Sequence, residues 1–280
     1  MLAARVRLPN KPLVVVPVGE CVYIGDAHGV LYALKTPYTS ATAVFQSVGP
    51  ISALVFSGDR LYYGNWDGDV GVVEVDGKKA NFGRHIVKCM VVHQDLIYAS
   101  VGNFVYVLDL DLAVVHEYKV EHKVLCMSVF EGAVYCGMGV PFVARIGDGI
   151  MILGKSAHET SIFCMCGEYT GSADGTVMRQ DYSSLERHVV IYKGQQWIRS
   201  MHSRYLFSEG KSVVADMSGI KCGSGTGFKH LYSHEADVVG VAAVGSKIVS
   251  IGLDYMYCVY DIGFEMSEEE EREIAELMGS

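Results

Sequence analysis

The feature that most constrains this chain is a four-residue pattern that recurs seven times. Each copy begins with an aliphatic residue, and its third position usually holds a small residue. The copies are Leu13–Val16, Ile51–Leu54, Val87–Met90, Val124–Met127, Ile162–Met165, Ile198–Met201 and Val238–Val241. Their last residues are 38, 36, 37, 38, 36 and 40 positions apart. A period of this length is typical of repeat proteins in which each unit packs against its neighbours.

A second pattern follows the first within every unit. Its copies are Tyr23–Gly25, Tyr62–Gly64, Tyr98–Ser100, Tyr135–Gly137, Tyr169–Gly171, Leu206–Ser208 and Ser250–Gly252. A turn such as Asp174-Gly175 and an apolar run such as Phe104–Leu108 come next. Short strands separated by glycine-containing turns form a meander rather than helices. Seven units of three or four strands predict an all-β, seven-bladed β-propeller.

The two ends of the chain predict how the ring closes. The seventh unit supplies three strands between Val238 and Ile262 but no fourth, whereas Ala3–Leu8 has no place in the first blade. An N-terminal strand that completes the last blade would cover two open sheet edges. We expect the propeller to span residues 1–263 and an acidic C-terminal helix or tail to span residues 264–280.

The C-terminal segment combines acidic residues with one apolar helix face. Ser267 and Glu270 form a capping box, and Ile274, Leu277 and Met278 fall on one side of a short helix. The six glutamates between residues 268 and 276, against Arg272, place more than half of the net charge of −9 in this segment. The segment is interpreted either as a solvated helix or as one that docks on a partner.

Composition excludes several classes of protein. Because the remaining chain carries little net charge, a basic face for direct nucleic-acid binding is not expected. The uncharged apolar stretch Gly132–Ala144 is shorter than the ~18 apolar residues of a membrane span, so no membrane insertion is expected. A short apolar run follows Arg5, Arg7 and Lys11, as in a signal peptide. Because Pro17 interrupts that run, a signal peptide is not expected.

Eight cysteines without a Cys-x-x-Cys pair favour a reducing cytoplasmic or nuclear compartment over a disulfide or zinc framework. Three of them, Cys89, Cys126 and Cys164, occupy the third position of the first pattern, where other units carry small residues. They therefore predict tight packing of inner strands rather than thiol chemistry. Cys164 and Cys166 could share one strand face, but no matching histidine pair follows.

Other motifs also favour a structural interpretation. His230 and His234 stand four apart, which separates them by about 13 Å on a strand, so we expect loop histidines rather than a zinc pair. Gly223–Gly227 lacks the Lys-Ser/Thr of a phosphate-binding loop and is interpreted as an inserted loop. No cofactor or metal is expected.

The repeat unit resembles that of the WD-repeat family across residues 3 to 263. The clearest blades are Ile51–Asp76, with Gly64–Gly68, and Ile162–Asp181, with Gly171–Val177. No blade has the Gly-His pair or the Trp-Asp ending of that family, so its buried hydrogen-bond tetrad is expected to be mostly missing. A weaker resemblance over Lys123–Tyr182 is to the propellers of the mitotic checkpoint and mRNA export. The alternative is a quinoprotein-like propeller, which the run Val22–Leu34 is similar to.

Candidate partner-binding residues lie at loop tips and strand starts. Trp66 is a large aromatic residue on a turn, and such residues are typical anchors of protein interfaces. Trp197 and Arg199 open the sixth unit on the same expected face, and Arg84, Lys88 and Phe163 lie near equivalent positions. On the C-terminal helix the candidates are Ile274, Leu277 and Met278.

Two hypotheses of function follow. The first is a non-enzymatic, monomeric WD-repeat scaffold that binds other proteins within a multiprotein complex. It depends on the repeat, on the lack of a convergent catalytic set and on the appended helix. The second is a propeller enzyme, or a small-ligand or metal-binding propeller, with its site at the axial channel.

Overall fold

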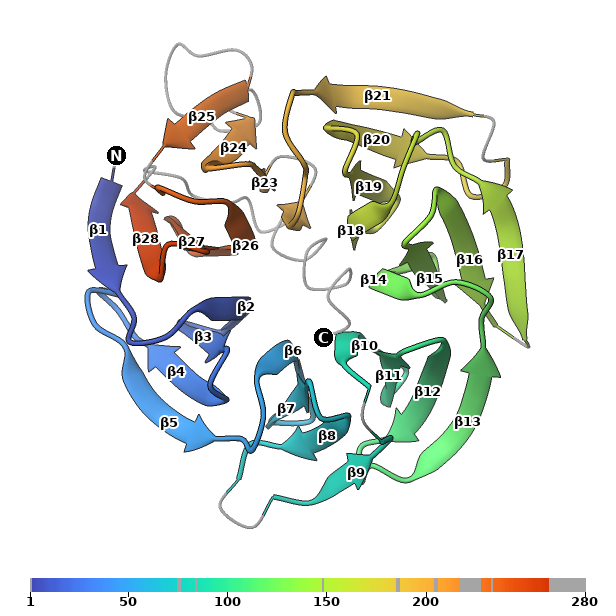
Figure 1. Cartoon of the computed structure of the whole chain (residues 1–280), viewed down its shortest axis with the longest axis horizontal. Coiled ribbons are helices and arrows are strands. Elements are labelled where there is room, and N and C mark those ends of the chain that lie inside the picture. The colour runs from blue at the N-terminus through green and yellow to red at the C-terminus, as the bar shows by residue number, and fades with distance from the viewer. Residues whose placement is uncertain are drawn as a thin grey trace.

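The computed structural model describes residues 2–74, 77–83, 85–147, 149–184, 187–203, 206–216, 228–232 and 234–261. These residues form seven four-stranded antiparallel sheets arranged as blades around a central axis (Figure 1). The sequence-predicted fold class, a seven-bladed propeller, is therefore confirmed. The expected C-terminal helix lies outside the described residues.

Each of the first six blades is a meander whose strands follow one another from the axis outward. Blade 1 contains β2 (Pro12–Val18), β3 (Cys21–Asp26), β4 (Val30–Leu34) and β5 (Thr42–Gln46). Blade 2 contains β6 (Ile51–Ser57), β7 (Arg60–Asn65), β8 (Asp69–Val72) and β9 (Lys79–Asn81). Blade 3 contains β10 (Val87–His93), β11 (Leu96–Val101), β12 (Phe104–Asp109) and β13 (Val114–Lys119).

The remaining blades continue the same order. Blade 4 contains β14 (Val124–Phe130), β15 (Ala133–Met138), β16 (Phe142–Ile146) and β17 (Ile150–Lys155). Blade 5 contains β18 (Ile162–Cys166), β19 (Tyr169–Ser172), β20 (Thr176–Gln180) and β21 (His188–Lys193). Blade 6 contains β22 (Met201–Ser203), β23 (Leu206–Glu209), β24 (Ser212–Asp216) and β25 (Phe228–Tyr232). Blade 7 contains β26 (Val238–Val244), β27 (Lys247–Gly252), β28 (Met256–Asp261) and, as its outermost strand, β1 (Leu2–Arg7).

The ring closes through its N-terminal strand, as the sequence predicts. β1 pairs antiparallel with β28, and the register joins Val6 to Tyr257 and Leu2 to Tyr260. Both aromatic partners are almost fully buried. Leu8, which directly follows β1, is buried in an apolar cluster that blades 7 and 1 share.

The apolar core lies between the blades. Successive residues of a strand point to opposite faces of its sheet. Each face of a blade therefore packs against a neighbouring blade. One cluster, for example, joins Tyr62 and Val70 of blade 2 to Val87 and Met90 of blade 3. The seven blades therefore stabilise one another around the ring.

Two of the repeat alignments need a shift of one residue. β2 and β3 pair Pro12 with Asp26 and Val14 with Gly25, so the first pattern of blade 1 starts at Pro12 rather than at Leu13. In blade 7, Gly240 pairs with Ile251, which places Ile251 rather than Gly252 in the glycine column. Both errors arise because the sequence allows two alignments. In blade 1 the run of apolar residues can be shifted by one position, and in blade 7 either Ile or Gly of Ser-Ile-Gly can be placed in the glycine column.

The two faces of the ring carry different connections. We call "top face" the side with the loops that lead into innermost strands, such as Gly49–Pro50, and with the turns between second and third strands, such as Trp66–Gly68. The N–H of Trp66 donates to the carbonyl of Pro50 at 3.0 Å, which joins these two kinds of connection. The "bottom face" carries the turns after innermost strands, such as Gly58–Asp59, and the loops between third and fourth strands, such as residues 35–41.

Candidate functional site

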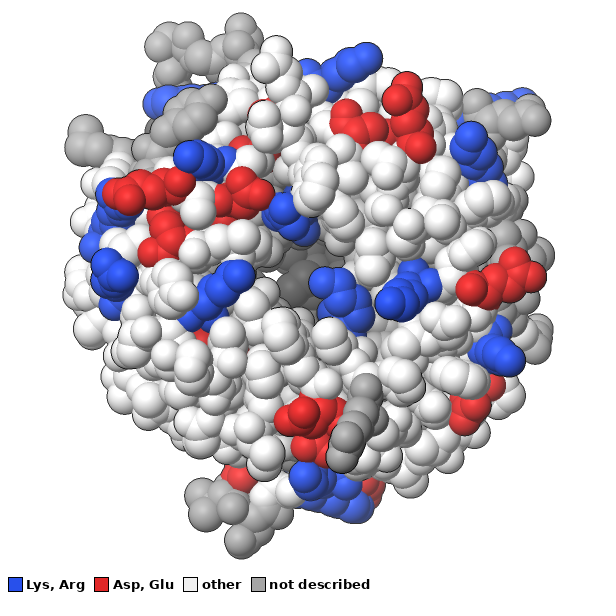
Figure 2. Space-filling model, viewed as in Figure 1, with Lys and Arg blue, Asp and Glu red and all other residues white. Residues whose placement is uncertain are grey.

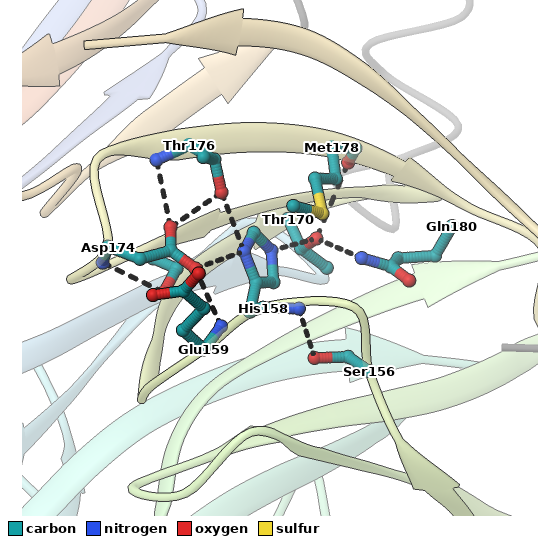
Figure 3. Close-up of polar contacts among 9 residues, drawn as sticks. Ser156, His158, Glu159, Thr170, Asp174, Thr176, Met178 and Gln180 are labelled. Atoms are coloured by element: carbon teal, nitrogen blue, oxygen red, sulfur yellow. Dashed lines mark hydrogen bonds and ion pairs between the residues drawn. The ribbon is translucent and has the colours of Figure 1, made fainter. Parts of the chain in front are cut away.

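A buried histidine network organises the top face of blade 5 (Figure 3). The ring of His158 meets Asp174 and Thr176 through Nδ1, at 3.2 and 2.9 Å, and Thr170 through Nε2, at 2.8 Å. Gln180 donates its amide to Thr170 at 2.9 Å. The network therefore runs from the loop before β18 through β19 to the end of β20, and it fixes these segments relative to one another.

The electrostatics of this network favour an ionised Asp174. Burial raises the pKa of the carboxyl group, but hydrogen bonds from His158, from Thr176 and from the N–H of Glu159 outweigh it and hold the pKa well below its usual range. The Glu159 N–H donates to Asp174 at 2.9 Å, so the acid also caps the loop before β18. These contacts are structural, because His158 and Thr170 are buried.

Blade 7 contains an equivalent network. His234 contacts Asp254 at 3.0 Å through Nδ1 and Ser250 at 2.8 Å through Nε2, and Ser250 reaches the hydroxyl of Tyr260 at 3.4 Å. The prediction from the sequence was that the tetrad of WD repeats is mostly missing, and neither of these two sites was identified. The available signal was a histidine four residues before an innermost strand, since His158 precedes Ile162 and His234 precedes Val238 by that distance.

Blade 6 lacks a histidine at this position and contains a pocket instead. Gly194 stands four residues before Ile198, and a Cβ built on it would lie 2.5 Å from Cδ of Glu209. Glu209 fills the vacated space and accepts the N–H groups of Gln195 and Gln196 at 2.7 and 3.1 Å. Beside it opens a pocket of about 520 Å³.

Polar groups line this pocket without forming a catalytic set. Tyr192 donates to Glu209 at 2.5 Å and lies 3.1 Å from Nε2 of His230, whose Nδ1 lies 3.1 Å from Ser212. Ser212 is only 2% exposed, and its hydroxyl donates to the carbonyl of Glu209 at 3.0 Å. A nucleophile must reach its substrate, so this serine–histidine pair is structural.

Three sequence-predicted residues meet beside the pocket and form what we call the aromatic–arginine cluster: Phe163, Trp197 and Arg199. The two rings lie 5.6 Å apart, and the guanidinium carbon of Arg199 lies 4.6 Å from the centre of the Trp197 ring. Asp237 fixes this arginine through an ion pair at 3.1 Å. Trp197 nevertheless remains 48% exposed. The cluster is therefore a preorganised, partly apolar surface.

The other sequence-predicted residues are separate from this cluster. Trp66 lies on the top face in the turn between β7 and β8 of blade 2 and is 44% exposed. Lys88 is an exposed residue of the innermost strand β10. Lys and Arg side chains border the central opening on the face drawn in Figure 2. Arg84, Ile274, Leu277 and Met278 lie outside the described residues.

The cysteines of the inner strands are buried or partly buried, and this burial disfavours their thiolate forms. Sγ of Cys126 lies 3.5 Å from the carbonyl oxygen of Ile162, the first residue of β18, and Sγ of Cys164 lies 3.7 Å from that of Ile198, just before β22. Burial raises the pKa of Cys89 to about 11 and that of Cys126 well above its usual range. Within the described ranges, no group of three or more His, Cys, Asp or Glu residues is arranged to hold a metal ion.

The histidines at 230 and 234 have separate environments. His230 is a residue of strand β25, whereas the buried His234 lies in the loop before β26. Only the second of them is therefore the loop histidine that the sequence predicts. Since each ring contacts different partners, the pair does not form a shared ligand set. The glycine-rich segment at 223–227 lies outside the described residues.

Comparison with solved structures shows that the fold is that of a WD40 β-propeller. The WD40 β-propeller domain of Doa1 superimposes with a TM-score of 0.77 and 12% sequence identity, covering 96% of this chain and 97% of that one. The computationally designed Ika8 protein gives a TM-score of 0.67 and 13% identity, covering 93% and 99%. At these identities the likeness establishes the fold alone.

The amino-acid sequence matches no family model. It also matches no curated protein. The comparisons therefore do not select a subfamily of propellers. Among the described residues there is no helix with the length and apolar character needed to cross a membrane. Because 1332 solved chains match this fold, the function must be argued from the surface of this particular chain.

Proposed function

We propose that this protein is a non-enzymatic scaffold of the WD-repeat type that binds a partner protein through the aromatic–arginine cluster on its top face. WD40 propellers generally serve as platforms for protein interactions, which supports the class. The observation that carries the proposal is the half-exposed Trp197, held between Phe163 and an arginine that Asp237 fixes in place. Aromatic and arginine residues of this kind dominate the binding energy of protein interfaces.

The cluster is suited to binding because its geometry exists before a partner arrives. A side chain that is already immobilised loses less conformational entropy on association. The ion pair of Arg199 with Asp237 restricts the guanidinium, and the two aromatic rings restrict each other. The neighbouring pocket, with Glu209 and His230 on its wall, offers hydrogen-bonding groups at the edge of the same surface.

The test compares the partners of three full-length forms in cells that express the protein naturally. Quantitative affinity purification should recover the same partners with the unmodified chain and with Phe56→Ala, whose ring is 39% exposed near the end of β6 that leads to the bottom face. Trp197→Ala combined with Phe163→Ala should lose at least one partner by about tenfold, equivalent to 1.4 kcal/mol. Unchanged recovery with a folded double variant would refute the proposal.

A further inference from the structure

Three lysines lie where innermost strands start on the top face, beside the central opening. Lys11 directly precedes β2, Lys123 directly precedes β14, and Lys88 is the second residue of β10. Figure 2 shows that Lys and Arg side chains border this opening. We call the three lysines the basic rim. None of them forms an ion pair with a described residue, and Lys88 and Lys123 are exposed.

The acids of the top face do not cancel this charge at the opening. Asp237, which directly precedes β26, is already paired with Arg199 at 3.1 Å. Glu235, three residues before β26, pairs with Arg5 of the outermost strand β1 at 3.0 Å, so this loop position faces the outside of the ring. Further exposed acids are Glu121 and Glu159, at the same position of blades 4 and 5, and Asp67, on a turn between a second and a third strand. In Figure 2 the acidic side chains accordingly lie farther from the opening than the basic ones that border it.

An exposed apolar surface lies across the opening from the aromatic–arginine cluster, on blades 2 and 3 (Figure 1). The N–H of Phe82 donates to the carbonyl of Gly68 at 2.9 Å, and that of Trp66 donates to Pro50, so the loops before β6 and β10 both adjoin the turn between β7 and β8. Each of these three segments carries one exposed apolar side chain. We call them the apolar triplet: Val48, Trp66 and Ile86, which are 87%, 44% and 42% exposed.

The top face therefore has two apolar regions with uncommitted positive charge between them. A ligand that matches this order carries negative charge in its middle and apolar groups at its two ends. A nucleic acid fits less well, because its phosphates would continue past the opening to the outer acids Asp67, Glu121 and Glu159. The acidic segment of the chain itself also fits less well. Asp261 ends the third strand of blade 7 at the bottom face, so residues 268–276 follow from the opposite side of the ring.

We propose that the top face binds an acidic segment of a partner protein that crosses the central opening. The carboxylates of this segment meet the basic rim. Its apolar side chains pack on Trp197 at one end and on the apolar triplet at the other, where Trp66 supplies the largest exposed ring. The inference rests on the scaffold function proposed above and names the kind of partner that the scaffold takes.

Fluorescence anisotropy of the full-length protein tests this site with labelled dodecapeptides. The acidic peptide has glutamates in the middle and Leu, Val and Phe at each end, the basic peptide has lysines in the middle, and a third peptide has glutamates between serine ends. We expect the acidic peptide to bind, the basic peptide not to bind, and the serine-ended peptide to bind at least about tenfold more weakly.

Two variants separate the charged from the apolar contacts. Lys88→Glu combined with Lys123→Glu, the rim variant, should weaken binding of the acidic peptide at least about tenfold, and Trp66→Ala at least about fivefold. The matched control is Lys35→Glu combined with Lys229→Glu, which makes the same change of net charge. Both control lysines are exposed, one just after β4 at the bottom face and one on the outermost strand β25. Equal thermal unfolding midpoints would show that all variants are folded.

Four outcomes would overturn the proposal. The first is no binding of the acidic peptide, and the second is equal binding by the rim variant. The third is tighter binding of a labelled oligouridine that the rim variant loses, which would identify a nucleic-acid site. The fourth is at least tenfold tighter binding of the acidic peptide by a full-length chain whose six glutamates between residues 268 and 276 are changed to glutamine, which would identify the chain's own acidic segment as the occupant.

Affinity purification of the rim variant separates this inference from the scaffold function. The rim variant should lose the same partner as Trp197→Ala combined with Phe163→Ala. If only the aromatic variant loses that partner, the partner is not acidic and the scaffold function stands. If neither variant loses a partner, the scaffold function fails as well.

Discussion

At the scale of single residues, the blades fit together because a glycine of one blade receives a branched side chain of the next. A Cβ built on Gly25 would lie 2.5 Å from Cγ2 of Ile51, and one built on Gly171 would lie 2.6 Å from Cγ2 of Ile198. Both isoleucines are fully buried; Ile51 begins β6, and Ile198 lies three residues before β22. This contact explains why the two recurring patterns of the sequence occur together: they are the two halves of one blade interface.

Substituting this glycine should therefore destabilise the protein by overpacking. We expect Gly25→Ala to lower the free energy of unfolding by roughly 2 kcal/mol, measured by urea denaturation. Gly147→Ala, where an added Cβ meets no neighbour within 4 Å, should change it by less than about 0.5 kcal/mol. The double variant with Ile51→Ala should cost less than the sum of the single variants. Strict additivity would contradict the proposed contact.

His202 should make stability depend on pH. Burial lowers the pKa of this histidine from its ordinary value of 6.5 to about 4. Between these values the unfolded chain binds a proton that the folded chain does not, so acidification through this range favours unfolding. The maximum loss is about 3 kcal/mol.

The measurement is the free energy of unfolding between pH 7 and pH 4.5, from urea titrations. His202→Leu should reduce the loss over this range, whereas His188→Leu, at an exposed site, should leave it unchanged. A second loss below about pH 4 is expected in both variants, because the depressed pKa of Asp174 stabilises the folded state only while its carboxyl is ionised. An unchanged slope in His202→Leu would show that other groups carry the pH dependence.

The sequence predicted part of the site at this scale. The second position of the recurring pattern placed Phe163 and Arg199 at equivalent points of adjacent blades, and Trp197 stands two residues before Arg199. The roles of Glu209 and Gln180 could not be predicted, because each depends on the size of the residue at another position of the fold. Glu209 occupies the space that Gly194 leaves, and Gln180 holds the place that Tyr260 fills in blade 7.

At the scale of elements, β1 joins the two ends of the chain in one sheet. It covers the edge of β28, where Tyr257, Cys258 and Val259 are all fully buried. Arg5 also forms an ion pair with Glu235 at 3.0 Å and lies 3.8 Å from Asp254, so the strand contacts the acid of the blade 7 histidine network.

Removing this strand should therefore open the ring. We expect deletion of residues 2–7 to lower the thermal unfolding midpoint by roughly 10 °C and to promote self-association through the edge of β28. A synthetic peptide of residues 1–9 should restore part of the midpoint, and a scrambled peptide should not. A deletion variant that unfolds at the original temperature would show that closure depends on other contacts.

Element order and ring closure could be predicted from the sequence because strand periodicity and turn residues are local signals. Exact register could not be predicted in blades 1 and 7. At Pro12–Val16 five consecutive apolar residues allow neighbouring alignments equally, and only the pairing with Asp26 and Gly25 selects one. Register is a property of two strands together, so one strand alone does not specify it.

At the scale of the whole molecule, the outermost strands of the blades are the least buried. The innermost strand β14 is buried along most of its length, whereas the outermost strands β13 and β21 are mostly exposed. Exposed strands with few apolar contacts open locally more often than buried ones.

Hydrogen exchange should show this radial order. We expect backbone amides of Val124–Phe130 to exchange at least about tenfold more slowly than those of Val114–Lys119, measured by mass spectrometry of peptic fragments. Both segments belong to neighbouring blades and differ mainly in their distance from the axis. Similar rates in the two segments would indicate that each blade opens as a unit rather than from its rim.

The packing of blade 7 against blade 1 differs from that of the blades that carry the glycine on their second strand. In blades 1, 2, 4 and 5 the second strand presents glycine to the next blade, whereas blade 7 presents Ile251 and carries its glycine, Gly240, on the innermost strand, where a Cβ would lie 2.7 Å from Val15. The interface that closes the ring therefore exchanges the positions of the large and the small side chain. A unit copied from blade 2 in place of blade 1 would bring Ile51 against Ile251, so this exchange distinguishes the closing interface from the others.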